Sequence, residues 1–297
     1  YNYGIKRYRH DLKKYPKRII LGSETFCADA YQFMQEAKRD KRIIGDFVWA
    51  GMDYLGEVGI GSWEYKEYAK RMDNGMGWVS AGSGRIDLTG KPLAEMAYTR
   101  VAFGLEDIAI GVVPVHQSHE MHSPSAWKMT NAMESWSWSG CDGKKATVEV
   151  YARAHHVSLF VNDVCVGTKQ LKNECKAFFH TEYHDGTLKA ISYDENNRTI
   201  AEKTLKTAGK ETILTLQPES KNVSEADLVY IRMKYTDQNG EVKPMVRGDI
   251  RVSAEGGRIL GIGSACPYYE RGYQQDTADT YYGEAMVIIK PEQAGRL

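Results

Sequence analysis

The periodicity of apolar residues changes once along this chain, near residue 104, and that change limits the folds open to it. Before it, short apolar runs flank a segment with helical spacing, which predicts a strand over 18–22, a helix over 26–40 and a second strand over 43–49. After it, runs such as 147–153 alternate apolar and polar residues, as strands with one buried face do. The pattern therefore predicts an α/β part followed by an all-β part.

The strand–helix–strand order of the first part predicts that its two strands pair in parallel, because parallel strands need a crossover connection. A single unit of this kind cannot cover both faces of its sheet, so it needs further strands. A TIM barrel, (β/α)8, is built from such units and places functional groups at the carboxyl ends of its strands. We therefore expect residues 1–107 to be the C-terminal portion of a TIM barrel whose remainder precedes Tyr1 in a longer polypeptide.

The all-β part divides into two similar blocks. Turn-forming residues at 162–163 and 194–197 separate predicted strands in the first block, and a turn at 237–240 does so in the second. Strands at such regular spacing are typical of β-sandwiches. We predict one sandwich over 108–209 and another over 210–297.

A long irregular stretch, residues 59–90, lies before a helix predicted over 91–103. Loops of this length in compact folds are usually functional or disordered, and two tryptophans, Trp63 and Trp78, favour an ordered loop. Their side chains either shape a cleft or pack on a neighbouring domain.

Composition excludes several classes of protein. The 297 residues carry 39 Lys+Arg and 39 Asp+Glu, so no net charge attracts nucleic acid or an anionic membrane surface. No apolar run approaches the roughly 20 residues of a membrane span. Five scattered cysteines without a CxxC pair suggest neither disulfides nor zinc. His116, His119 and His122 share no predicted face, so we expect a solvated loop there, and no metal or cofactor.

Two motifs in order resemble the last two barrel strands of glycoside hydrolase family 2, the β-galactosidase group: residues 19–25 and 44–57. The resemblance continues at 85–92, which is similar to the stretch before the family's final barrel helix, and at 136–138, 148–150, 157–167, 237–240 and 260–264 in the sandwiches. It implies a multidomain fold: an α/β part that is a partial (β/α)8 TIM barrel, followed by two all-β immunoglobulin-like sandwiches.

The same resemblance assigns roles to residues. It implies that Glu24 is the catalytic nucleophile and that Trp49 lines the sugar subsite. Asp53 and Glu57 either bind sugar hydroxyls, as substrate-binding residues, or cap the barrel rim. From the residues alone, the favoured interpretation of Glu24 is a carboxylate placed at a helix N-terminus, where the helix dipole stabilises it.

A retaining glycosidase needs a second carboxyl about 5 to 5.5 Å from its nucleophile, as general acid and base. The family takes this residue from an Asn-Glu pair after the fourth barrel strand. No such pair occurs in residues 1–107, while Asn173-Glu174 lies in the sandwich region and does not fit. We therefore expect this chain alone to be inactive.

The resemblance implies that the chain is the C-terminal part of a retaining exo-β-glycosidase that hydrolyses terminal β-linked sugars, with a β-galactosidase as the leading candidate. It also implies that the protein acts in the periplasm or outside the cell. A β-glucuronidase is the alternative within the class, although its Asn-x-Lys motif is not found over 59–91. A different class stays open: the two β parts bind carbohydrate or act as a spacer, without catalysis. Trp136 and Trp138, on a predicted strand, are interpreted as structural.

Overall fold

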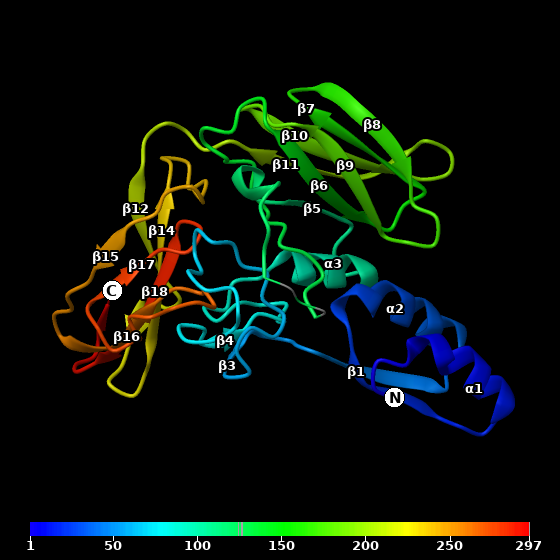
Figure 1. Ribbon diagram of the computed structural model, residues 1–297, viewed down its shortest axis with the longest axis horizontal. Helices are drawn as coiled ribbons and strands as arrows, with labels where there is room; N and C mark the ends of the chain where they lie inside the picture. The colour runs from blue at the N-terminus through cyan, green and yellow to red at the C-terminus, as the bar shows by residue number, and fades with distance from the viewer. Residues whose placement is uncertain (124, 126, 297) are drawn as a thin grey trace.

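The computed structural model describes residues 1–123, 125 and 127–296, and it consists mostly of β-sheets with few helices. An N-terminal α/β lobe and two β-sandwiches surround a segment of irregular chain (Figure 1). In the part of the chain that the structure describes, no helix has the length and apolar character to cross a membrane.

The N-terminal lobe contains two parallel strands and three helices. Its elements are α1 (Tyr8–Lys14), β1 (Ile20–Thr25), α2 (Ala30–Arg39), β2 (Ile43–Val48) and α3 (Ala94–Phe103). Strands β1 and β2 pair in parallel, which confirms the predicted pairing. Helix α2 begins later than predicted because residues 27–29 form a 3-10 turn. Helix α1, which the periodicity did not predict, buries Tyr8 and Leu12 against the lobe.

The two faces of the β1–β2 sheet differ in what covers them. Ile20 and Ile43 pack against the helices in one buried cluster. Neighbouring side chains are exposed, with Ile44 64% and Phe47 63% accessible and Leu21 40%. Among the described residues no third strand pairs with β1 or β2. A TIM barrel is therefore not shown by this structure, which contains two parallel strands where the sequence predicts part of a barrel.

The first β-sandwich has two sheets around one core. Its strands are β5 (Ile108–Val112), β6 (Lys145–Ala152), β7 (His156–Val161), β8 (Val164–Gln170), β9 (Lys176–Glu182), β10 (Thr187–Tyr193) and β11 (Thr199–Lys206). The sheets have the orders β5-β6-β9 and β11-β10-β7-β8. Trp136 and Trp138 are fully buried in the core between them, on a segment without regular secondary structure and not on the predicted strand. Asn162 and Asp163, both with positive φ, form the predicted turn of the β7–β8 hairpin.

The last β-sandwich is built on a four-stranded sheet of order β12-β14-β18-β16. Its strands are β12 (Ile213–Pro218), β13 (Asn222–Val223), β14 (Val229–Thr236), β15 (Asp249–Arg251), β16 (Gly257–Gly263), β17 (Thr277–Asp279), β18 (Glu284–Pro291) and β19 (Gly295–Arg296). Met233 and Ile262 from this sheet pack with Ile250 and Ala278 from the β15–β17 pair. The alternating pattern therefore produces a second core, separate from the first.

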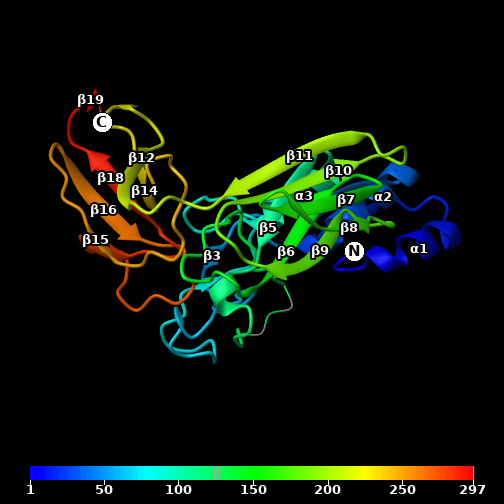
Figure 2. The same ribbon diagram turned by 90° about the horizontal axis from the view of Figure 1, so that it is seen from above.

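The segment between β2 and α3 contains the short strands β3 (Tyr54–Leu55) and β4 (Ser80–Ala81) and lies between the two sandwiches (Figures 1 and 2). Trp78 is 5% exposed and meets the ring of Tyr268 edge to face, 6.0 Å between centroids. Gly77 has φ +93°, and a Cβ there would lie 2.5 Å from that ring. Trp78 thus packs on a neighbouring domain, one of its two predicted alternatives.

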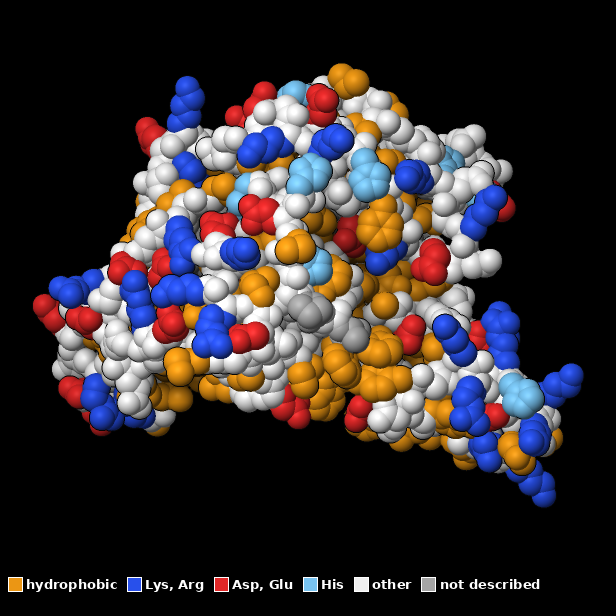
Figure 3. Space-filling view, viewed as in Figure 1, with side chains coloured by type: hydrophobic (Ala, Val, Ile, Leu, Met, Phe, Trp, Pro, Cys, Tyr) orange, Lys and Arg blue, Asp and Glu red, His pale blue; other side chains and the backbone are white. Residues whose placement is uncertain are grey.

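The N-terminal lobe also contacts the first sandwich. Ala30 of α2 and Ala94 and Tyr98 of α3 share a buried cluster with Ala109 of β5 and Tyr151 of β6. Apolar side chains also gather on the surface where this lobe joins the rest of the molecule (Figure 3). The lobe is thus fixed on one side and has apolar surface uncovered on another.

Candidate functional site

Glu24 is the second-last residue of β1 and is partly exposed. Its backbone carbonyl accepts a hydrogen bond from the N–H of Tyr3 at 2.7 Å, which places the N-terminal segment alongside β1. Burial raises the pKa of Tyr3, and the charge of Glu24 raises it further.

Trp49 follows β2 directly, and its N–H donates to the carbonyl of Thr25 at 3.1 Å. Glu24 and Trp49 thus lie at the carboxyl ends of neighbouring parallel strands. The indole of Trp49 meets the ring of Tyr54 edge to face, 5.8 Å between centroids. The Tyr54 hydroxyl donates to the Glu57 carboxylate. Burial and this carboxylate both raise the pKa of Tyr54.

Tyr54 and Tyr3 are close enough for their phenols to interact electrostatically. The structure therefore brings Glu24, Trp49 and Glu57 to one region, joined by two tyrosines that the sequence analysis did not single out. The signal available for Tyr3 was only its place in an aromatic stretch at the start of the chain.

A fourth aromatic residue reaches this region from the first sandwich. Trp127 belongs to the connection between β5 and β6, and its Nε1–H donates to the Tyr3 hydroxyl at 2.9 Å. The sequence analysis missed Trp127, because a single tryptophan in a polar connection carries no periodic signal. Only the fold brings it to Tyr3, 124 residues away.

Asp53 lies apart from these residues. Its side chain is buried and accepts a hydrogen bond from the N–H of Gly84 at 2.7 Å. The two backbones approach so closely that a Cβ on Gly84 would lie 2.1 Å from the Asp53 nitrogen. Burial raises the pKa of Asp53 to about 6. These contacts support the alternative in which Asp53 braces the rim, and its substrate-binding role stays a prediction.

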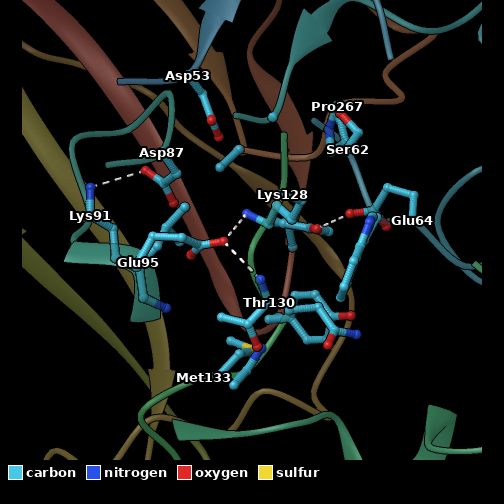
Figure 4. Close-up of a pocket in the computed structure, with 18 of the residues that line it drawn as sticks. Asp53, Ser62, Glu64, Asp87, Lys91, Glu95, Lys128, Thr130, Met133 and Pro267 are labelled. Atoms are coloured by element: carbon cyan, nitrogen blue, oxygen red, sulfur yellow. Dashed lines mark hydrogen bonds and ion pairs between the residues drawn. The ribbon is translucent and has the colours of Figure 1, made fainter. Parts of the chain in front are cut away.

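Asp53 borders a cavity of about 90 Å³ that lies between the segment joining β2 to α3 (residues 49–93, here called the rim), the β5–β6 connection and the last sandwich. Its carboxylate points into the same space as the side chains of Glu64, Glu95 and Lys128 (Figure 4). Lys128 pairs with Glu95 at 3.4 Å. Burial alone would lower the pKa of Lys128, but the carboxylates of Glu95 and Asp53 raise it. The cavity has room for a few water molecules.

Glu64 is the most perturbed acid of this cavity. It accepts a hydrogen bond from the hydroxyl of Tyr281 in the last sandwich, and its other oxygen has no protein partner. Burial raises the pKa of Glu64 to about 8, because desolvation disfavours the charged form. Glu64 therefore helps to join the rim to the last sandwich, away from Glu24.

The three predicted loop histidines differ in their surroundings. His119 and His122 are exposed, and His122 stacks on Trp63 with 4.6 Å between ring centroids. His116 departs from the solvated loop expected there, because it is largely buried and bonds the Glu67 carboxylate at 2.9 Å. Within the described ranges no group of three or more His, Cys, Asp or Glu side chains is arranged to hold a metal ion.

The chemistry available here is that of a partly exposed carboxylate at the end of β1, with Trp49 at the end of the neighbouring strand β2. Two other carboxylates of the region are already engaged: Glu57 binds Tyr54, and Asp46 accepts the hydroxyl of Thr25 at 2.6 Å. Glu24 thus has the exposure that attack on a substrate requires. A general acid would have to come from elsewhere.

Comparison with known proteins gives two family matches, both in the β part. Residues 214–297 match the family described as glycoside hydrolase family 2 C-terminal domain 5. Residues 143–201 match a family described as a domain of unknown function (DUF4982). A curated relative, the β-galactosidase BoGH2A of Bacteroides ovatus, is 24% identical over 254 residues, which are 84% of this chain and 25% of the relative.

Solved structures extend the similarity over the whole chain. A glycosyl hydrolase family 2 member from Bacteroides cellulosilyticus matches 99% of this chain with a TM-score of 0.85 and 27% identity. A family 2 β-glucuronidase matches 90% of it with a TM-score of 0.65 and 17% identity, a likeness of fold alone. The resemblance to glycoside hydrolase family 2 is thereby confirmed. The chain spans 39% and 25% of these two proteins, and a quarter of the curated relative.

Proposed function

We propose that this chain is the C-terminal portion of a retaining β-glycosidase. The leading candidate is a β-galactosidase, which is the activity in the name of the curated relative. Residues 1–107 would complete a TIM barrel begun upstream, and 108–209 and 210–297 would be immunoglobulin-like domains behind it. The exposed apolar side chains of β1 and β2 support the barrel, since such a face needs further strands to cover it.

In this proposal Glu24 attacks the anomeric carbon of a terminal β-linked sugar. The bond to the leaving oxygen breaks as an upstream glutamate protonates that oxygen, and a covalent glycosyl-enzyme forms. The same upstream residue then takes a proton from a water molecule as the water oxygen attacks the anomeric carbon. The bond to Glu24 breaks, and the sugar leaves with its β configuration retained. Trp49 would pack against the sugar ring, and Glu57 would bind a hydroxyl.

The observation that carries the proposal is the position of Glu24. It is a partly exposed carboxylate at the carboxyl end of a parallel strand, beside a strand that ends in Trp49. In barrels of this kind, functional groups at strand carboxyl ends form the site.

The test uses the full polypeptide with its upstream portion. We expect Glu24→Gln to lower turnover of an aryl β-galactoside by at least about 1000-fold, because the nucleophile is lost, and to abolish covalent labelling by a 2-fluoro-β-galactoside. Glu106→Gln, at a surface acid paired with Arg100, is the matched control and should label as the parent does. Labelling of the Glu24→Gln protein at the parental rate would remove Glu24 from the mechanism.

The sugar is tested in the same assay. We expect an aryl β-galactoside to be turned over faster than an aryl β-glucuronide. Faster turnover of the glucuronide would show that the substrate is a β-glucuronide and not a β-galactoside. It would leave the proposed role of Glu24 as nucleophile unchanged.

A further inference from the structure

We propose that Tyr268 of the last β-sandwich is a positioning residue for Glu57, which in the proposed function binds a sugar hydroxyl. The inference rests on that function and adds to it a part for the last sandwich in sugar binding. Tyr268 acts through the backbone of the rim and not by contact with the sugar.

The turn that carries Glu57 has a backbone shape that needs support from its surroundings. Gly56 and Glu57 have φ of +89° and +44°, both in the left-handed region. Glycine adopts this region freely, whereas a residue with a Cβ keeps it only where neighbouring structure holds it there. The Glu57 side chain is exposed, and its carboxylate accepts the hydroxyl of Tyr54, so its own packing supplies little of that support.

The support comes from β4 and the residue before it. The N–H of Gly56 donates to the Val79 carbonyl at 3.0 Å, and the N–H of Gly59 donates to the Ser80 carbonyl at 3.1 Å. These two bonds lie on either side of Glu57 in the sequence. One strand of the rim therefore holds both ends of the turn.

The last sandwich holds the same part of the rim through its own backbone. The N–H of Val79 donates to the Pro267 carbonyl at 2.8 Å, and the N–H of Tyr269 donates to the Gly77 carbonyl at 2.7 Å. The two segments run antiparallel where they meet. A ladder of backbone hydrogen bonds thus leads from the last sandwich to the turn at Glu57.

The side chain of Tyr268 fixes this pairing in place. Its ring is buried and meets the indole of Trp78 edge to face, with 6.0 Å between centroids. The backbone of Gly77 comes so close that a Cβ there would lie 2.5 Å from the ring. Removing the ring would leave a cavity between the rim and the sandwich, into which the neighbouring segments can relax.

This arrangement has a consequence for binding and little for the chemical step. A displaced Glu57 weakens a hydrogen bond to the sugar in the bound substrate and in the transition state alike. Losing such an interaction raises KM and leaves kcat near its parental value. For one hydrogen bond, the expected rise in KM is roughly 2- to 10-fold.

The experiment measures kcat and KM in the full polypeptide with the aryl glycoside that the parent turns over faster. We expect Tyr268→Ala to raise KM roughly 2- to 10-fold. Tyr268→Phe keeps the ring and should restore the parental KM. Met233→Ala is the control, because it opens a cavity in a core cluster that contains no rim residue. It should lower the melting temperature, as Tyr268→Ala does, and leave KM unchanged.

A double-mutant cycle links Tyr268 to Glu57. Glu57→Ala removes the carboxylate and keeps a residue with a Cβ at the same φ. We expect Tyr268→Ala to raise KM in the parent and to leave KM unchanged in the Glu57→Ala protein.

Two results would overturn the inference while leaving Glu24 as nucleophile. One is a KM for Tyr268→Ala that matches that of Met233→Ala. The other is full additivity of Tyr268→Ala and Glu57→Ala in their effects on KM, which would mean that Tyr268 acts without Glu57. Turnover that survives Glu24→Gln would instead overturn the proposed function, and this inference with it.

Discussion

The β1–β2 sheet and the first β-sandwich come from the same chain but differ in how they cover their apolar side chains. In the sandwich, residues from both sheets meet in one core, and Trp138 and Leu159 are fully buried. In the β1–β2 sheet, helices cover Ile20 and Ile43 while Ile44 and Phe47 are exposed. Because buried apolar area drives folding, we expect the sandwich to fold from its own residues and the sheet to need further strands.

Separating the two regions tests this comparison most severely. We expect residues 108–209, expressed alone, to unfold cooperatively on heating and to elute as a compact species. Residues 1–107 alone should lack a cooperative transition, because two strands with an uncovered apolar face are not stable in water. Circular dichroism melting and size-exclusion chromatography would measure both. A sharp thermal transition for residues 1–107 would break the comparison.

Matched truncations sharpen the comparison within the intact 297-residue chain. We expect Trp138→Ala to lower the free energy of unfolding by about 3 to 5 kcal/mol, because it leaves a cavity in a closed core. Phe47→Ala should change it by less than about 0.5 kcal/mol, since that ring is 63% exposed. Denaturant titration gives both values.

In the full polypeptide, the effect of Phe47→Ala on the free energy of unfolding should be larger. If upstream strands cover Phe47, the same Phe47→Ala substitution becomes costly there. A cost that stays near zero in both contexts would argue against a covering barrel.

The junction between the rim and the last sandwich is the third region to compare. Its contribution to the free energy of unfolding depends on pH. The native pKa of Glu64 is raised to about 8 by burial, above its unfolded value. The folded state therefore holds a proton that the unfolded state releases, so this contribution to stability is present at low pH and is lost as pH rises toward 8. The slope from this one group is at most about 1.4 kcal/mol per pH unit.

Glu64→Gln should remove that slope, because a glutamine is neutral at every pH. Melting temperatures of the parent and Glu64→Gln proteins at pH 5, 6, 7 and 8 would measure it. The two curves should diverge with rising pH, with the variant the more stable at pH 8. Parallel curves would show that Glu64 keeps its charge in the folded junction.

The sequence predicted elements whose signal is local. The parallel pairing of β1 with β2 followed from strand–helix–strand order, and the turn at Asn162 and Asp163 followed from residue types that tolerate positive φ. Helix α1 escaped prediction because its buried residues, Tyr8 and Leu12, are too few to give a period over seven residues.

The candidate site was predicted less completely than the fold. Glu24 and Trp49 were found through motifs at strand ends. Tyr3, Tyr54 and Trp127 were missed because each depends on a contact with a partner elsewhere, such as the 2.9 Å bond between Trp127 and Tyr3. Asp53 was grouped with Glu57 by proximity in sequence, yet its side chain turns inward to the Gly84 N–H. Short spacing does not reveal which way a loop residue points.

The bond between Tyr281 and Glu64 joins residues 217 positions apart, so synthesis order matters for the rim. At roughly 5 to 20 residues per second, the ribosome needs about 10 to 40 s after Glu64 before Tyr281 exists. For most of that interval Tyr268 is also missing, so the indole of Trp78 lacks the ring on which it packs in the folded protein. We therefore expect the nascent protein to present a chaperone-binding surface at this place, and the rim to be the last part of the molecule to mature.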